Sequence, residues 1–136
     1  MSASTYGSKS TPITLQMMRF VFKNVGGVAP GPIGNLAYEV FCTPMKRSKS
    51  DFSGANLPEP ELFSIPFRSG KLQAYAWGSG PIVLGVHGWE SSAARYSAFV
   101  KPLTDAGYRV VLVDGHAHGA SSGWKTDAIR YGDGTK

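Results

Sequence analysis

Two short apolar runs separated by a helical pattern constrain the fold of this chain more than any other feature. Residues 82–86 read IVLGV and residues 109–113 read RVVLV. Between them, apolar residues recur at helical spacing through 93–106, and Gly107 ends that segment. A strand, a helix and a second strand within about thirty residues form a βαβ unit with parallel strands and a right-handed crossover. We expect both strands to be buried on their two faces.

A β-hairpin is predicted immediately before this unit. Apolar residues alternate with other residues over 63–67, which is the period of a half-buried strand. Pro66 confines that strand to a sheet edge or a bulge, because proline has no N–H to donate. Ser69-Gly70 forms a tight turn, and 71–77 returns as the second strand. The fold class is therefore α/β, with a hairpin followed by a parallel βαβ unit.

Composition limits the broad class of the protein. The chain of 136 residues is long enough for one domain, and its 42% hydrophobic content is typical of a packed core. The single cysteine, Cys42, excludes an intramolecular disulfide and a cysteine-based zinc site. No apolar run approaches the roughly 18 residues of a transmembrane helix, and no convincing secretory signal is present. We expect a cytoplasmic protein.

The positive charge lies in the N-terminal part of the sequence. The formal net charge is +5, and residues 1–50 hold six basic residues against Glu39 alone. We interpret residues 1–59 as a basic arm and residues 60–136 as the globular part. Within the arm we expect a helix over 13–25, with polar residues on one narrow stripe and apolar residues elsewhere. Such a helix needs a wide apolar surface, either the body of the protein or a membrane interface.

The remainder of the arm shows weaker patterns. Residues 28–35 (VAPGPIGN) read as a loop, and residues 36–42 as a short helix that ends before Pro44. Residues 45–60 read as a polar linker, which places the domain boundary near residue 60. At the other end, Thr126 is a candidate N-cap of a further helix.

Candidate functional residues gather after the two parallel strands. In open parallel sheets, ligands bind beyond the carboxyl ends of the strands. His87-Gly88-Trp89-Glu90 follows the first of these strands, and residues 114–123 (DGHAHGASSG) follow the second. All three histidines of the chain lie in these two segments. A histidine in a loop is commonly satisfied by backbone partners, but this concentration indicates a functional edge of the sheet.

Residues 60–136 resemble the N-terminal part of an α/β-hydrolase domain of the serine esterase or lipase type. The resemblance rests on a strand ending in His-Gly-x, a helix, and a strand ending in Asp before a loop rich in Gly, His and Ser. In the family this loop usually reads Asp-x-Pro-Gly/Ala-His-Gly-x-Ser. The matching positions are Asp114, Ala117, His118, Gly119 and Ser121, whereas His116 stands where proline is usual.

The resemblance implies particular roles for these motifs. The backbone N–H of Trp89 would be one donor of an oxyanion hole, and Gly88 would let the backbone approach a substrate. The Trp89 ring would wall the pocket, although simple packing explains it equally well. Asp114, His118 and Ser121 would hold their loop by hydrogen bonds rather than react. No cofactor is implied, and the expected substrate is a small ester or related acyl compound.

The sequence shows no recognisable catalytic triad. Gly119-Ala120-Ser121-Ser122-Gly123 matches the G-x-S-x-G pattern, but it does not join a strand directly to a helix, and no histidine follows it. We therefore expect the nucleophile, acid and histidine to lie beyond residue 136, and the chain alone to be inactive. The sheet would be incomplete, and the strand at 109–113 would present an exposed apolar edge.

Two other interpretations stay open. Asp114-Gly115-His116-Ala117-His118 resembles the His-x-His of metal-dependent amidohydrolases, in which His116 and His118 would share one zinc ion. Alternatively, the helix over 13–25 and the basic residues Lys46, Arg47 and Lys49 would form a non-enzymatic membrane-surface module. Nucleic-acid binding is not expected, because basic and aromatic residues do not interleave.

Overall fold

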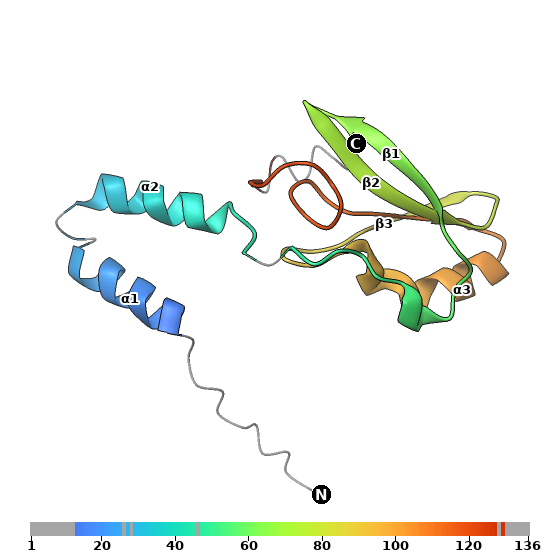
Figure 1. The fold of residues 1–136 in the computed structure, drawn as a ribbon, viewed down its shortest axis with the longest axis horizontal. Coiled ribbons are helices and arrows are strands. Elements are labelled where there is room, and N and C mark those ends of the chain that lie inside the picture. Colours follow the sequence, from blue (N-terminus) through green and yellow to red (C-terminus); the bar gives the residue numbers. More distant parts are fainter. Residues whose placement is uncertain (1–12, 26, 28, 46, 128, 130–136) are drawn as a thin grey trace, which may run out of the picture. The chain divides into compact units, whose positions relative to one another are not determined.

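A computed structural model describes residues 13–25, 27, 29–45, 47–127 and 129. The chain forms two compact units, Met1–Glu39 and Val40–Lys136 (Figure 1). The helix expected after Thr126 falls mostly on residues outside the described ranges. Within those ranges, no helix has the length and apolar character that crossing a bilayer requires.

The second unit is built on a four-stranded mixed sheet. Its strands are β1 (Glu61–Phe67), β2 (Gly70–Trp77), β3 (Ile82–Val86) and β4 (Arg109–Val113), in the order β1-β2-β4-β3 (Figure 1). β1 and β2 pair as an antiparallel hairpin, and β2 pairs antiparallel with β4. β3 and β4 are parallel, with Val86 opposite Val113. The predicted hairpin and parallel βαβ unit are thus both present, and Pro66 lies on an edge strand.

The positions of β3 and β4 in the sheet differ from the prediction. β4 lies between β2 and β3, so residues 109–113 are not an exposed edge. The two edge strands are β1 and β3, and on β3 Ile82 is 68% and Leu84 is 49% exposed. The expectation that β3 is buried on both faces is therefore wrong. Its apolar sequence is that of an inner strand, but among the residues that the structure describes it pairs with β4 alone.

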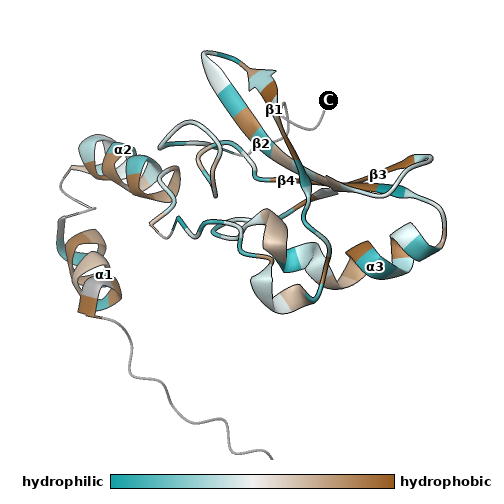
Figure 2. Cartoon of the chain, turned by 45° about the vertical axis from the view of Figure 1, so that its right-hand side comes forward, coloured by the Kyte–Doolittle hydropathy of each residue, from teal (hydrophilic) through white to brown (hydrophobic). Residues whose placement is uncertain are grey.

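Alternation along β4 supplies both faces of the sheet with core residues. Val110 and Leu112 point to one face, where they pack with Tyr75, Trp77 and Val100. Val111 and Val113 point to the other face and pack with β2 and the partly buried aromatic side chains of β1. The first face is covered by η2 (Ala93–Tyr96) and α3 (Ser97–Asp105), which form the predicted helical segment between the strands (Figure 2).

The segment before the sheet contains more helix than predicted. α1 (Ile13–Val25) forms as expected, but α2 runs over Pro30–Phe41 and includes most of the predicted loop 28–35. Prolines are tolerated in a first helical turn, because the first four N–H groups of a helix have no intrahelical acceptor. Both Pro30 and Pro32 occupy that turn, and the Ile33 N–H donates to the Ala29 carbonyl (3.1 Å). Proline therefore starts this helix rather than preventing it.

Residues 47–58, which we call the strap, pack on the sheet. Phe52 lies 5.0 Å, between ring centroids, from both Tyr75 and Trp77. The indole N–H of Trp77 donates to the carbonyl of Pro58 (2.8 Å). A short 3-10 turn, η1 (Ser53–Ala55), lies within the strap. The compact unit begins at Val40 and includes the strap, whereas the sequence placed the boundary near residue 60.

Candidate functional site

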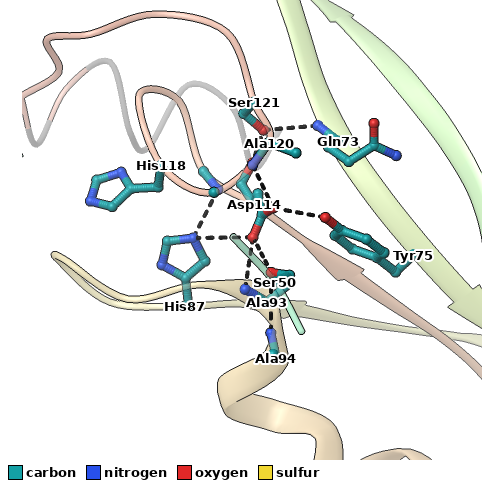
Figure 3. Close-up of polar contacts among 12 residues, drawn as sticks. Ser50, Gln73, Tyr75, His87, Ala93, Ala94, Asp114, His118, Ala120 and Ser121 are labelled. Carbon is teal, nitrogen blue, oxygen red and sulfur yellow. Dashed lines mark hydrogen bonds and ion pairs between the residues drawn. The ribbon is translucent and has the colours of Figure 1, made fainter. Parts of the chain in front are cut away.

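Two loops meet at the carboxyl ends of the parallel strands. The first loop (residues 87–92) follows β3, and the second loop (residues 114–123) follows β4. Because Val86 lies opposite Val113, His87 and Asp114 begin the two loops side by side. Both side chains are fully buried, and Figure 3 shows them at the centre of one polar network.

Both ring nitrogens of His87 are hydrogen-bonded, and Nε2 connects the first loop to the second. Its Nε2 accepts the backbone N–H of Gly115 (3.0 Å), so Nδ1 carries the ring proton and donates to the Gly88 carbonyl (2.7 Å). Burial lowers the pKa of His87 from its ordinary value, and the opposing effect of the Gly88 hydrogen bond is smaller. The 4.0 Å approach to Asp114 is therefore a contact of a neutral imidazole with a carboxylate.

His118 makes the reciprocal connection. Its Nε2 accepts the backbone N–H of Glu90 (3.0 Å) from the first loop, and its Nδ1 donates to the carbonyl of His116 (2.9 Å). The rings of His87 and His118 meet edge to face, with centroids 5.1 Å apart. Each loop thus sends a histidine to a backbone amide of the other loop. We call this arrangement the histidine brace.

Asp114 anchors the surrounding segments. Its Oδ1 accepts from the hydroxyl of Ser50 (2.7 Å) and the N–H of Ala93 (2.8 Å). Its Oδ2 accepts from the hydroxyl of Tyr75 (3.0 Å) and the N–H of Ala120 (2.9 Å) (Figure 3). Burial, followed by the negative charge of Asp114, raises the pKa of Tyr75 to about 12. The carboxylate therefore ties the strap, a sheet residue, η2 and the second loop to one point.

Ser121 is a buried structural hydroxyl in this loop. Its Oγ donates to the backbone carbonyl of Asp114 and accepts the N–H of Gln73 (2.8 Å). Gly119, two residues earlier, has φ of +50°, and a Cβ there would lie 2.1 Å from the Asp114 carboxylate. Only glycine fits this turn. The G-x-S-x-G pattern at 119–123 therefore arises from loop packing and does not present a nucleophile.

The orientation of the Gly88–Trp89 peptide follows from the contact of His87 with the Gly88 carbonyl. His87 holds the Gly88 carbonyl, and in a trans peptide the following N–H points away from that carbonyl. The Trp89 N–H is therefore directed away from the His87 ring. A Cβ added at Gly88 would meet no atom within 4 Å, so the space beside this residue is open.

The Trp89 side chain is held between two rings and is 41% exposed. It stacks on Phe41 with a centroid distance of 5.7 Å and an interplanar angle of 6°. On another side it meets the His118 ring edge to face at 5.3 Å. These contacts fix the side chain next to the histidine brace.

The strap contributes residues that sequence reasoning did not place in the site. The Arg47 guanidinium donates to three backbone carbonyls of the second loop, those of Gly119 (3.1 Å), Ser121 and Gly123 (2.8 Å). Ser50, three residues later, donates to Asp114. The membrane-module interpretation places Arg47 in a basic cluster, but its guanidinium is hydrogen-bonded to the second loop. Nothing local in the sequence signals such long-range partners.

The metal-site interpretation receives no support from the histidine geometry. Both ring nitrogens of His118 are used by backbone groups, and the His116 ring packs against Phe67 at 5.4 Å. Among the residues that the structure describes, no three metal-binding side chains come together.

Comparison with known proteins gives structural neighbours only. No family model and no curated protein sequence matches the chain. Solved structures with similar folds include a thioesterase domain from the curacin biosynthetic pathway (33% identity, TM-score 0.45). An epoxide hydrolase variant of Vigna radiata (26%, 0.45) and an epoxide hydrolase from an endophytic Streptomyces (27%, 0.46) are also similar.

These neighbours are thioesterase and epoxide hydrolase structures of the α/β-hydrolase fold. The matches cover 48%, 48% and 49% of this chain and 24%, 21% and 20% of those chains, respectively. The matched region thus spans about a quarter or less of each neighbour's length.

Proposed function

We propose that this chain is the N-terminal part of an α/β-hydrolase-like serine hydrolase that acts on an ester or a related small acyl substrate. In this proposal the Trp89 N–H is one of two oxyanion donors. The observation that supports it is the hydrogen bond from His87 Nδ1 to the Gly88 carbonyl (2.7 Å), because the Trp89 N–H of the same trans peptide then points away from His87.

A fixed orientation of the donor N–H matters for acyl transfer. Attack on an acyl carbon places negative charge on the carbonyl oxygen, and N–H donors aimed in advance stabilise that charge without reorganising. One donor of this kind contributes roughly 2.7–4 kcal/mol to transition-state stabilisation. His87 acts here as a positioning residue, because it holds the peptide that carries the donor.

The remaining machinery lies outside the described residues. Ser121 is buried and doubly hydrogen-bonded, and both histidines of the brace are engaged by backbone groups. We therefore propose that the nucleophile, acid and base come from further chain, and that this chain alone does not hydrolyse esters. Turnover of p-nitrophenyl acetate by the purified chain that is lost in Ser121→Ala would contradict this part of the proposal.

In this proposal the triad lies in further chain, so the donor role is tested in a protein that extends beyond residue 136. Trp89→Pro removes the N–H and should lower kcat by roughly 100- to 1,000-fold, the usual effect of losing one oxyanion donor. Trp89→Ala removes the aromatic ring but keeps the N–H, and serves as the matched control. Equal losses of kcat in the two variants would show that the ring, not the amide, matters. A downstream sequence without a nucleophile elbow and a later histidine would overturn the assignment to this class.

A further inference from the structure

The N-terminal helix α1 carries a strip of strongly exposed apolar side chains. Ile13, Met17 and Phe20 are 75%, 65% and 68% exposed, respectively. Their spacing of four and three residues places them on one face of the helix. Leu15 and Phe22 are also exposed, at 40% and 37%, so the apolar arc is wider than one strip. An arc this wide requires a broad apolar environment rather than a narrow groove.

Basic residues border this strip, and acidic residues are missing from the helix. Arg19 and Lys23 are exposed and lie one turn apart. Lys23 is about 60° around the helix axis from Phe20, so its ammonium group can reach outward beside the apolar strip. Glu39 is the first acidic residue of the sequence. The charge of α1 is therefore complementary to an anionic surface.

We propose that α1 is an interfacial helix that binds the chain to an anionic lipid surface. A helix of 13 residues is about 20 Å long, which is too short to cross a bilayer but suits a helix lying in its plane. In that position Ile13, Met17 and Phe20 enter the boundary between headgroups and acyl chains. Arg19 and Lys23 remain at the level of the lipid phosphates.

The basic residues of this proposal are not those that the sequence-based membrane module used. Arg47 donates to three carbonyls of the second loop, and Lys46 lies outside the described residues. The proposal therefore rests on Arg19 and Lys23 within α1. It is independent of the proposed hydrolase function, because none of these residues takes part in the two loops of the candidate site.

The test is flotation of the full chain with two kinds of vesicle. One is phosphatidylcholine alone, and the other is phosphatidylcholine with phosphatidylserine. We expect binding to the anionic vesicles, weaker binding to the neutral ones, and a decrease with added salt. Arg19→Glu/Lys23→Glu should lower the anionic partition coefficient at least about 25-fold, since each lost basic contact accounts for roughly five-fold. Met17→Ser/Phe20→Ser should also lower it with the charge unchanged.

The matched control is Lys71→Glu/Lys101→Glu, which changes the net charge equally but acts on exposed lysines of the second unit. It should leave most of the binding intact, and circular dichroism should show the same helix content in all variants. Equal losses in both charge variants would reveal binding through net charge alone and would overturn the proposal. So would the absence of binding to anionic vesicles. Neither result depends on ester hydrolysis.

Discussion

At the residue scale, Asp114 is the most highly connected polar side chain in the candidate site. Its two oxygens accept four hydrogen bonds in a fully buried position. A buried carboxylate is tolerated because its oxygens accept hydrogen bonds. Removing one of these donors should lower the free energy of unfolding more than a substitution on the surface does. The surrounding backbone has no spare room: Gly119 lies directly against this carboxylate with a positive φ.

Because of this crowding, we expect alanine substitutions at two glycines to differ strongly in their effect on the free energy of unfolding. Gly119→Ala should lower the free energy of unfolding by about 2 kcal/mol or more, because the new Cβ meets the Asp114 carboxylate in a strained backbone conformation. Gly88→Ala should cost less than about 1 kcal/mol, since no atom lies within 4 Å of the added Cβ. Urea denaturation of the two variants measures the difference. Similar costs at the two positions would contradict the packing around Asp114.

At the element scale, the strap holds the second loop from outside the sheet. Arg47 accounts for three of the strap-to-loop hydrogen bonds, and they end on carbonyls that a planar guanidinium can reach together. Arg47→Ala should therefore raise the hydrogen-exchange rates of amides in residues 117–123 while those of β1 and β2 change little. Arg47→Lys should restore only part of the protection, because an ammonium group does not match the same fork of acceptors.

Lys49→Ala removes an exposed basic residue two positions further along the strap and is the matched control. Uniform loss of protection across the second unit in Arg47→Ala would show that the clamp supports the whole unit instead of one loop. Unchanged exchange in residues 117–123 would show that the contacts of Arg47 do not hold the loop.

Local sequence patterns predicted the positions of the strands but not their order in the sheet, which depends on distant partners. Period-two alternation and short apolar runs located β1 to β4, because side-chain spacing is a property of each strand alone. Whether β3 or β4 lies at the edge depends on pairing order, which no single run encodes. The start of α2 was missed because Pro30 and Pro32 read as helix breakers, although a first turn accepts them.

In the candidate site, too, local patterns predicted the segments but not their distant partners. The two loops follow from their position after parallel strands, and the histidines and Asp114 are within them. Arg47 and Ser50 could not be predicted, because they reach the second loop from more than sixty residues away in sequence. The oxyanion role of Trp89 stays a prediction that the Trp89→Pro experiment decides.

At the scale of the whole molecule, the helix with exposed apolar side chains and the hydrophobic core belong to different units. Residues 1–39 contain three basic residues and one acidic residue, and their helix α1 exposes apolar side chains. The second unit contains the sheet and both core clusters. Its two loops bury polar side chains, and burial lowers the pKa of one of them, His87. We therefore expect the free energy of unfolding of this unit to depend on pH.

The histidine brace predicts the direction of that sensitivity. The pKa of His87 is lowered from 6.5 in the folded protein by burial, whereas the unfolded chain takes up the proton near 6.5. Below that pH the unfolded state binds more protons, so the free energy of unfolding falls as the pH decreases from about 6.5 to the folded-state pKa of His87. One such group contributes a slope of at most about 1.4 kcal/mol per pH unit. Protonation of Nε2 would also remove the acceptor of the Gly115 N–H.

Urea denaturation at a series of pH values checks this prediction. His87→Gln places an amide oxygen, which does not titrate, near the position of Nε2, and the decline below pH 6.5 should flatten in that variant. The hydrogen bonds from Ser53 lower the pKa of Asp51 from 3.8, so its effect is confined to more acidic conditions and does not overlap the His87 window. An equal decline in the wild type and His87→Gln between pH 6.5 and 5 would assign the sensitivity to another group. A decline that disappears in His87→Gln would identify the brace as the feature through which pH acts on the fold.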